Sequence, residues 1–142
     1  MADSYQELFD FLDRLGNTLD ELTEIEKEKT SAVMHDDLLG VDACMKKEQA
    51  VSLRLRKMDT ERDALFAAVG GAGKPLSALP ELCPPEKRAE AREIVEWLRD
   101  NYAIYRSAAE VSRTTLEVNL HQIEKIIDTL PENGGSIADI RA

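Results

Sequence analysis

One uninterrupted stretch, residues 86–130, constrains the fold of this chain more than any other feature. It contains neither proline nor glycine, and it lies between Pro84-Pro85 and the run Pro131-Glu132-Asn133-Gly134-Gly135. Apolar or small residues recur in it at steps that, with three polar residues included, are all three or four, the period of one helix face. The apolar or small positions are Ile94, Leu98, Tyr105, Ala108, Leu116, Ile123, Ile126 and Leu130, and the polar ones are Asn101, Ser112 and Asn119. The pattern predicts a helix over residues 85–130, roughly 68 Å long. Such a helix needs packing partners along its length.

Two further helices are expected in the proline-free segment before Pro75, at residues 3–34 and 37–69. The first has a heptad-like series: Leu8, Leu12, Leu15, Leu19 and Leu22. The second has a longer one: Val41, Met45, Glu48, Val51, Leu55, Met58, Arg62, Leu65 and Val69. A short break between two long amphipathic helices predicts an antiparallel hairpin. The fold class is therefore all-α, an antiparallel three-helix bundle or coiled-coil hairpin with a long third helix.

The first helix becomes polar near its end, where Glu26 and Lys29 occupy the next positions of the leucine series. Either this end is more solvated, or the two long side chains lie across the series and pair. The break follows at His35-Asp36-Asp37, where Asp36 is expected to accept a hydrogen bond from the first turn of the second helix.

A single helical domain, residues 1–142, accommodates the remaining segments. The glycines of residues 70–73 end the second helix, and a short helical turn within the loop at residues 70–84 closes one end of the bundle. Residues 131–142 are expected to be a flexible tail. Trp97 lies off the centre of the long helix's apolar face and is expected to pack against the hairpin.

Composition and motifs disfavour several classes of function for this protein. Twenty-eight acidic against eighteen basic residues give a net charge of −10, which disfavours nucleic acid and anionic membranes as partners. Cys44 and Cys83 lack metal-ligand spacing and are expected to be reduced thiols. Glu117 and His121 alone make a weak metal site, and no catalytic constellation stands out, so we expect no metal, no cofactor and no enzymatic activity. The acidic N-terminus and the absence of long apolar runs favour a cytoplasmic protein without membrane insertion.

The third helix is longer than the other two by about twelve residues, on a rise of 1.5 Å per residue. If it runs back antiparallel to the second helix, it extends beyond the hairpin near Asn119, yet its sequence then becomes more apolar: Leu116, Leu120, Ile123, Ile126, Ile127 and Leu130. Exposed apolar patches of this kind mark interaction sites. Three alternatives remain open: the hairpin covers this end, a second copy of the chain pairs with it, or it captures another protein.

The order and spacing of these features resemble the flagellar export chaperones of the FlgN type. The likeness covers about residues 5–130 and includes the leucine-rich first helix, the segment Glu26-Lys27-Glu28-Lys29 before an acidic turn, and Lys46-Lys47-Glu48-Gln49-Ala50. Arg62 and the step Thr115-Leu116-Glu117 in the long helix also fit. Many family members have asparagine where this chain has Ser112.

The resemblance implies a cytoplasmic bacterial chaperone without cofactor or catalytic activity. Its relatives cover the C-terminal, helix-prone segments of hook–filament junction proteins before type III export, and they present the loaded substrate to the membrane export gate. We therefore expect partner binding at the following residues: Leu116, Asn119, Leu120, Ile123, Ile126, Ile127 and Leu130. The free protein would be a monomer or a homodimer, and a self-associating coiled-coil protein is the alternative function.

Overall fold

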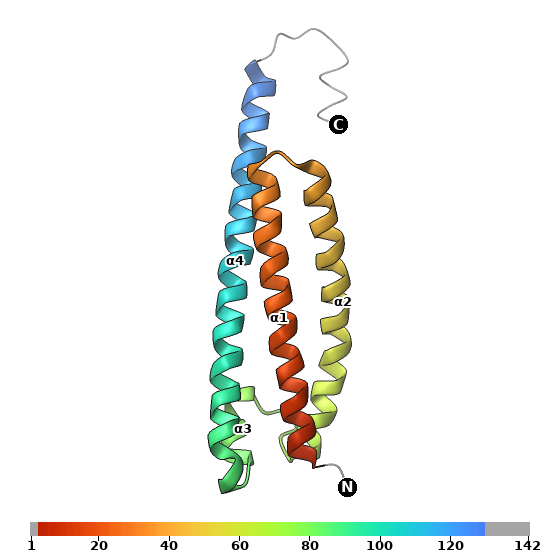
Figure 1. Ribbon diagram of the computed structural model, residues 1–142, viewed down its shortest axis with the longest axis vertical. Helices are drawn as coiled ribbons and strands as arrows, with labels where there is room; N and C mark the ends of the chain where they lie inside the picture. Colours follow the sequence, from red (N-terminus) through yellow and green to blue (C-terminus); the bar gives the residue numbers. More distant parts are fainter. Residues whose placement is uncertain (1–2, 130–142) are drawn as a thin grey trace.

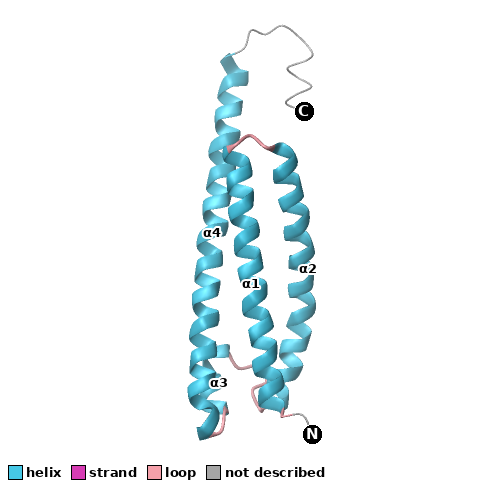
Figure 2. Cartoon of the chain, in the orientation of Figure 1, coloured by secondary structure: helices cyan, strands magenta, loops and turns pink. Residues whose placement is uncertain are grey.

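The computed structural model describes residues 3–129, and within them the chain forms helices and short connecting segments without a strand (Figure 2). The helices are α1 (Ser4–Met34), α2 (Leu38–Ala68), the short α3 (Leu79–Leu82) and α4 (Arg88–Thr129). Single 3-10 turns, η1 (Leu76–Ala78) and η2 (Pro85–Lys87), precede α3 and α4. The predicted all-α fold is confirmed. The long helix was expected from residue 85, but the proline-led turn η2 precedes its regular part.

α1 lies at the centre of the bundle. It packs against both α2 and α4, and the three long helices run up, down and up, so that α4 is parallel to α1 (Figure 1). This position buries more of α1 than its leucine series alone, including Phe9, Phe11 and Ile25. α2 buries only one narrow side: Cys44, Val51, Met58 and Phe66.

The buried side of α2 differs from the predicted one at its first turns. Met45 was expected to face the core, but it is 47% exposed, whereas the neighbouring Cys44 is buried. Val51 and Met58 are buried as expected, but farther along Phe66 is buried, whereas the expected Leu65 beside it is only partly buried. Cys44 belongs to one buried cluster with Leu22, Ile25 and Val51, so it contributes a small side chain to the α1–α2 interface.

Asp36 ends α1 and does not cap α2, so the prediction for its side chain was wrong. The Asp36 N–H donates to Val33 O (3.2 Å) and the Asp37 N–H to Ala32 O (2.8 Å), the double hydrogen bond of a Schellman C-cap. Asp36 has a φ of 53°, the left-handed conformation this motif requires. The α2 cap is Asp37, whose carboxylate accepts from the Gly40 N–H at 2.9 Å.

The segment after α2 closes the lower end of the bundle. Gly70, with a φ of 78°, ends α2 in a second Schellman motif, and the Gly71 N–H donates to Phe66 O at 2.8 Å. Leu79 of α3 is then fully buried against the core. The Tyr5 hydroxyl donates to Leu82 O at 3.0 Å, so α1 is tied to this closing segment.

Candidate partner-binding site

The register between α1 and α4 fixes where α1 ends along the long helix. Asn101 Nδ2 donates to Gly16 O at 3.4 Å, and the Trp97 ring lies directly over Gly16. These parallel helices therefore align residues 85 positions apart. Carried upward, this register places Met34, the last residue of α1, level with Asn119.

α4 continues beyond this level to Thr129 (Figure 1). We call residues 120–129 the overhang; at 1.5 Å per residue it is about 15 Å long. The turn between α1 and α2 lies below it, so within the described residues no helix of this chain runs beside it. Of the three alternatives that the sequence left open, coverage of this end by the hairpin is wrong.

The apolar side chains of the overhang are exposed. Leu120 is 56% exposed, Ile123 44% and Ile126 62%. Ile127 is partly buried. Leu116 and Asn119, just below the overhang, are also partly buried, as expected for positions beside the last turn of α1. Leu130 lies outside the described residues.

A shallow apolar groove accompanies α4 below the overhang. It has a volume of about 370 Å³ between α1 and α4, and its lining includes Lys27, Thr30, Ile104 and Val111. Ile104 and Val111 are each more than half exposed, as is Val118 one further heptad along. Ile104 was not predicted as a surface residue of interest. A second heptad series (104, 111, 118) beside the main one was the signal that could have found it.

A buried polar layer lies beneath the overhang, where all three long helices meet. Lys29 Nζ lies 2.7 Å from Glu48 Oε2 and 3.2 Å from Glu26 Oε2. Glu26 is 3% exposed and Lys29 8%. Of the two arrangements that the sequence allowed, the structure therefore has the paired one, and the partner from α2 is Glu48.

The two carboxyl groups of this layer share the single lysine and affect each other. Burial, followed by the contact with Glu48, raises the pKa of Glu26. The hydrogen bond from Glu26, helped by Lys29, lowers the pKa of Glu48. Burial opposes the charge on Lys29, but the hydrogen bonds and charges of Glu48 and Glu26 together outweigh it, and the pKa of Lys29 is raised. Glu26 thus holds its proton more tightly and Glu48 less tightly than a free glutamate.

Ser112 is the contribution of α4 to this layer and is completely buried. Its hydroxyl has no hydrogen bond of ordinary geometry among the described residues, although it lies close enough to Glu26 to favour the ionised carboxylate. An O–H rotates freely, so a small adjustment of either side chain would complete the bond. The layer lies between the main apolar core below and the overhang above.

The remaining sequence candidates are not brought together. Glu117 and His121 are exposed, and residues 3–129 contain no cluster of three His, Cys, Asp or Glu side chains able to hold a metal ion. Cys44 and Cys83 are buried free thiols, and burial raises the pKa of each. Among the helices of the described range, none is long and apolar enough to cross a membrane.

Comparison with known proteins identifies the family. The model of the family described as FlgN protein matches residues 1–137. Neither the curated proteins nor the solved structures contain a match. The match covers all three long helices, including the overhang and the polar layer. The chain therefore belongs to the FlgN family, the flagellar export chaperones.

Proposed function

We propose that this chain binds the C-terminal amphipathic helices of hook–filament junction proteins in the bacterial cytoplasm and shields them before export. The proposed contact residues are Leu116, Asn119, Leu120, Ile123, Ile126, Ile127 and Leu130. One observation carries the proposal: α4 keeps its apolar face after α1 has ended, where the described chain offers nothing to cover it. Family membership gives the general role of a flagellar export chaperone, and the exposed face supports a specific place for it.

The energetics favour capture of a helix. Leu120, Ile123 and Ile126 are each 44–62% exposed. Roughly half of the about 1.5–3 kcal/mol that full burial of such a side chain contributes is therefore still available to each on binding. An amphipathic helix that lays its apolar side along the overhang would bury all three, which follow one another at steps of three residues. Binding and release of this kind need no nucleotide and no chemical step.

The surface charge suits a carrier of aggregation-prone ends. The net charge of −10 keeps the protein soluble while one apolar face is open. It also opposes pairing of two copies through the same face, because each copy brings the same excess of acidic groups. The loaded complex would then be presented to the membrane export gate, a step that rests on the family role alone.

Binding of a purified hook–filament junction protein tests the proposal, with wild type and Ile123→Asp compared by calorimetry. Ile123→Asp places a charge in the proposed contact and should weaken binding at least about a hundredfold. Leu53→Asp is the matched control, because Leu53 is 53% exposed on α2, away from the overhang. Equal binding by wild type and Ile123→Asp would overturn the proposal.

Solution mass separates the chaperone from the self-associating alternative. The proposal expects monomers for both wild type and Ile123→Asp. A stable wild-type dimer that Ile123→Asp converts into a folded monomer, together with no binding of the junction protein, would establish self-association through the overhang instead.

A further inference from the structure

The two ends of the bundle differ. At the lower end, Leu79 and Cys83 of the closing segment are 0% and 2% exposed and cover the core. At the upper end, Met34, Leu38 and Leu39 are 70%, 79% and 84% exposed. Single exposed apolar residues are ordinary on protein surfaces, but these three lie within a stretch of six residues that contains the turn between α1 and α2. We call Met34, Leu38 and Leu39 the hairpin tip.

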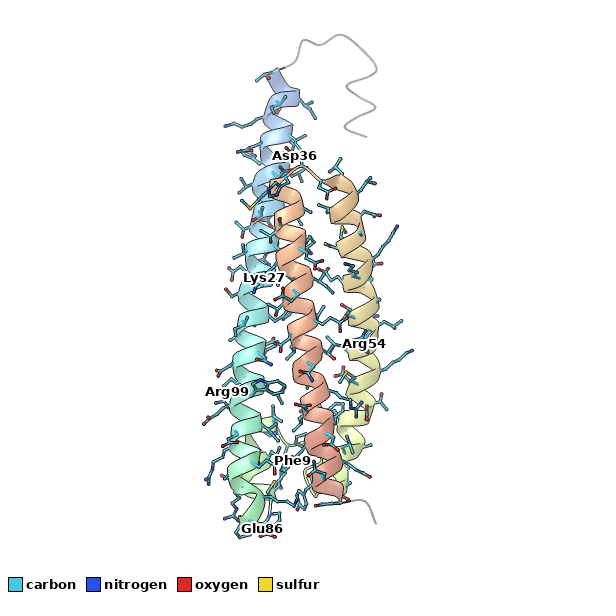
Figure 3. The ribbon with its side chains drawn as sticks, viewed as in Figure 1. Phe9, Lys27, Asp36, Arg54, Glu86 and Arg99 are labelled. Carbon is cyan, nitrogen blue, oxygen red and sulfur yellow. The ribbon has the colours of Figure 1, made fainter. Side chains whose placement is uncertain are left out.

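The hairpin tip lies at the foot of the overhang. The register between α1 and α4 places Met34 level with Asn119, and the overhang begins at the next residue. Figure 3 shows Asp36 at the top of the hairpin, at the height where α4 continues alone. Met34 therefore lies at the foot of the overhang, and Leu38 and Leu39 follow it across the turn, at the start of α2. We refer to the overhang as the wall and to the hairpin tip as the floor.

We propose that the hairpin tip is the floor of the partner site, on which the end of the bound amphipathic helix rests. The partner helix stands in line with α1, because the α4 face that packs on α1 below is continuous with the face of the overhang above. The complex extends the bundle upward by replacing α1 with the partner. This inference rests on the proposed function, since it adds a second contact to the same site.

Charge at the floor sets the direction of the partner helix. The exposed Asp36 stands at the C-terminal end of α1, the end at which the helix dipole carries partial negative charge. The Asp37 carboxylate accepts a hydrogen bond from the first turn of α2, and its charge offsets the partial positive charge at that end of the helix. The positive N-terminal end of a helix dipole, or a lysine or arginine there, complements this floor. The partner helix is therefore parallel to α1, with its N-terminal end on the tip.

A second copy of the chain is the poorer occupant. It would bring its own net charge of −10 to an acidic floor. A foreign helix with a basic end satisfies both the wall and the floor.

The test compares three variants in binding to a full-length hook–filament junction protein. Leu38→Ser/Leu39→Ser should weaken binding about tenfold or more, corresponding to roughly 1.4 kcal/mol. Met34→Ser removes an apolar side chain of the same floor from a different helix and should act in the same direction. Both changes affect strongly exposed residues, so circular dichroism should show an unchanged fold. The third variant, Ile123→Asp, tests the contribution of the overhang to the same binding.

The outcomes distinguish the two proposals. Loss of binding in Ile123→Asp with wild-type affinity in both tip variants would overturn the floor and leave the proposed function standing. Wild-type affinity in all three variants would overturn both. Loss in all three supports the floor.

A charge reversal tests the direction of the helix. Asp36→Lys should weaken binding several-fold more than Asp59→Lys, which makes the same change in net charge at an exposed position of α2 away from the tip. Equal effects of the two reversals would contradict the assigned direction.

Discussion

Gly16 determines how closely the two main helices of the bundle approach. A methyl group at this position would overlap the six-membered ring of Trp97, and the Gly16 carbonyl accepts from Asn101. The expectation that Trp97 packs against the hairpin is confirmed, because it contacts the core from α4. Gly16 itself went unnoticed in the sequence, since a glycine within a helix gives no sign of the ring it accommodates.

Replacement of Gly16 by alanine should therefore destabilise the protein by about 1–3 kcal/mol through overpacking. This loss outweighs the gain of about 1 kcal/mol in helix propensity. Urea unfolding followed by circular dichroism measures the free energy of unfolding. Asn17→Ala is the control, because Asn17 is the exposed neighbour in the same helix. If Gly16→Ala is as stable as wild type or more stable, the close approach of Trp97 is wrong.

Glu26 makes the stability of the bundle depend on pH. Its pKa is raised by burial and by Glu48, so the folded state holds this proton at pH values where the unfolded chain has lost it. Stability from this group is present at low pH and declines as pH rises from the usual glutamate pKa, about 4.3, to the raised one. Glu48 acts in the opposite sense: its lowered pKa contributes stability that is lost as pH falls below the usual range.

Glu26→Gln should raise the free energy of unfolding at pH 8 by about 1 kcal/mol, because it removes one buried charge and leaves Lys29 paired with Glu48. It should also flatten the decline in stability between pH 5 and pH 8. Urea unfolding at both pH values gives these quantities. Glu24→Gln removes an exposed charge from the same helix and serves as the control. A Glu26→Gln variant less stable than wild type at pH 8 would show that the ionised Glu26 stabilises the layer.

At the scale of the helix, α4 consists of two parts that differ in what covers them. Up to Ser112 its apolar face is buried against α1 and the core, with Leu98 only 3% exposed. Beyond Asn119 the same face is open. The overhang should therefore contribute little to the stability of the free protein.

The double variant Leu120→Ser/Ile123→Ser should change the free energy of unfolding by no more than about 0.5 kcal/mol, the usual range for surface positions. Leu98→Ala, in the packed part of the same helix, should cost about 2–5 kcal/mol. Thermal and urea unfolding of the two variants provide the comparison. A loss of stability in the double variant close to that of Leu98→Ala would mean that the overhang belongs to the core of the free protein.

The sequence alone predicted α4 and the level at which it outruns the hairpin, because helix rise and periodicity depend only on local geometry. The structure agrees on Asn119, although the register that fixes it comes from Asn101 and Gly16. The ending of α1 was predicted less well. Asp36 and Asp37 each suit a cap, and only the backbone conformation at Asp36 shows which helix each one serves.

At the scale of the whole molecule, the central position of α1 could not be predicted from the periodicity of the sequence. Each long helix has an apolar face, but only the packing reveals that α1 is covered from both sides while α2 and α4 are covered mainly from one. The pairing of Glu26, Lys29 and Glu48 depends on the same arrangement, because Glu48 comes from another helix. The exposed hairpin tip also follows from it, since nothing in a single helix marks an uncovered end.

The architecture gives the two ends of the bundle different surfaces. The chain after α2 closes the lower end with α3 and the flanking turns, while α4 passes the upper end and offers an open face (Figure 1). A partner that joins the upper end extends a bundle that is already folded. The loaded chaperone would therefore differ from the free one mainly above the polar layer of Glu26, Lys29 and Glu48.

Hydrogen exchange in the free and loaded protein tests this central claim most directly. In the free protein, amides of residues 120–129 should exchange much faster than those of residues 91–105, because only the latter are packed against the core. Addition of a hook–filament junction protein should slow exchange in residues 116–129 and leave α2 between residues 45 and 68 unchanged. Protection confined to α2, or none in the overhang, would contradict the proposed site.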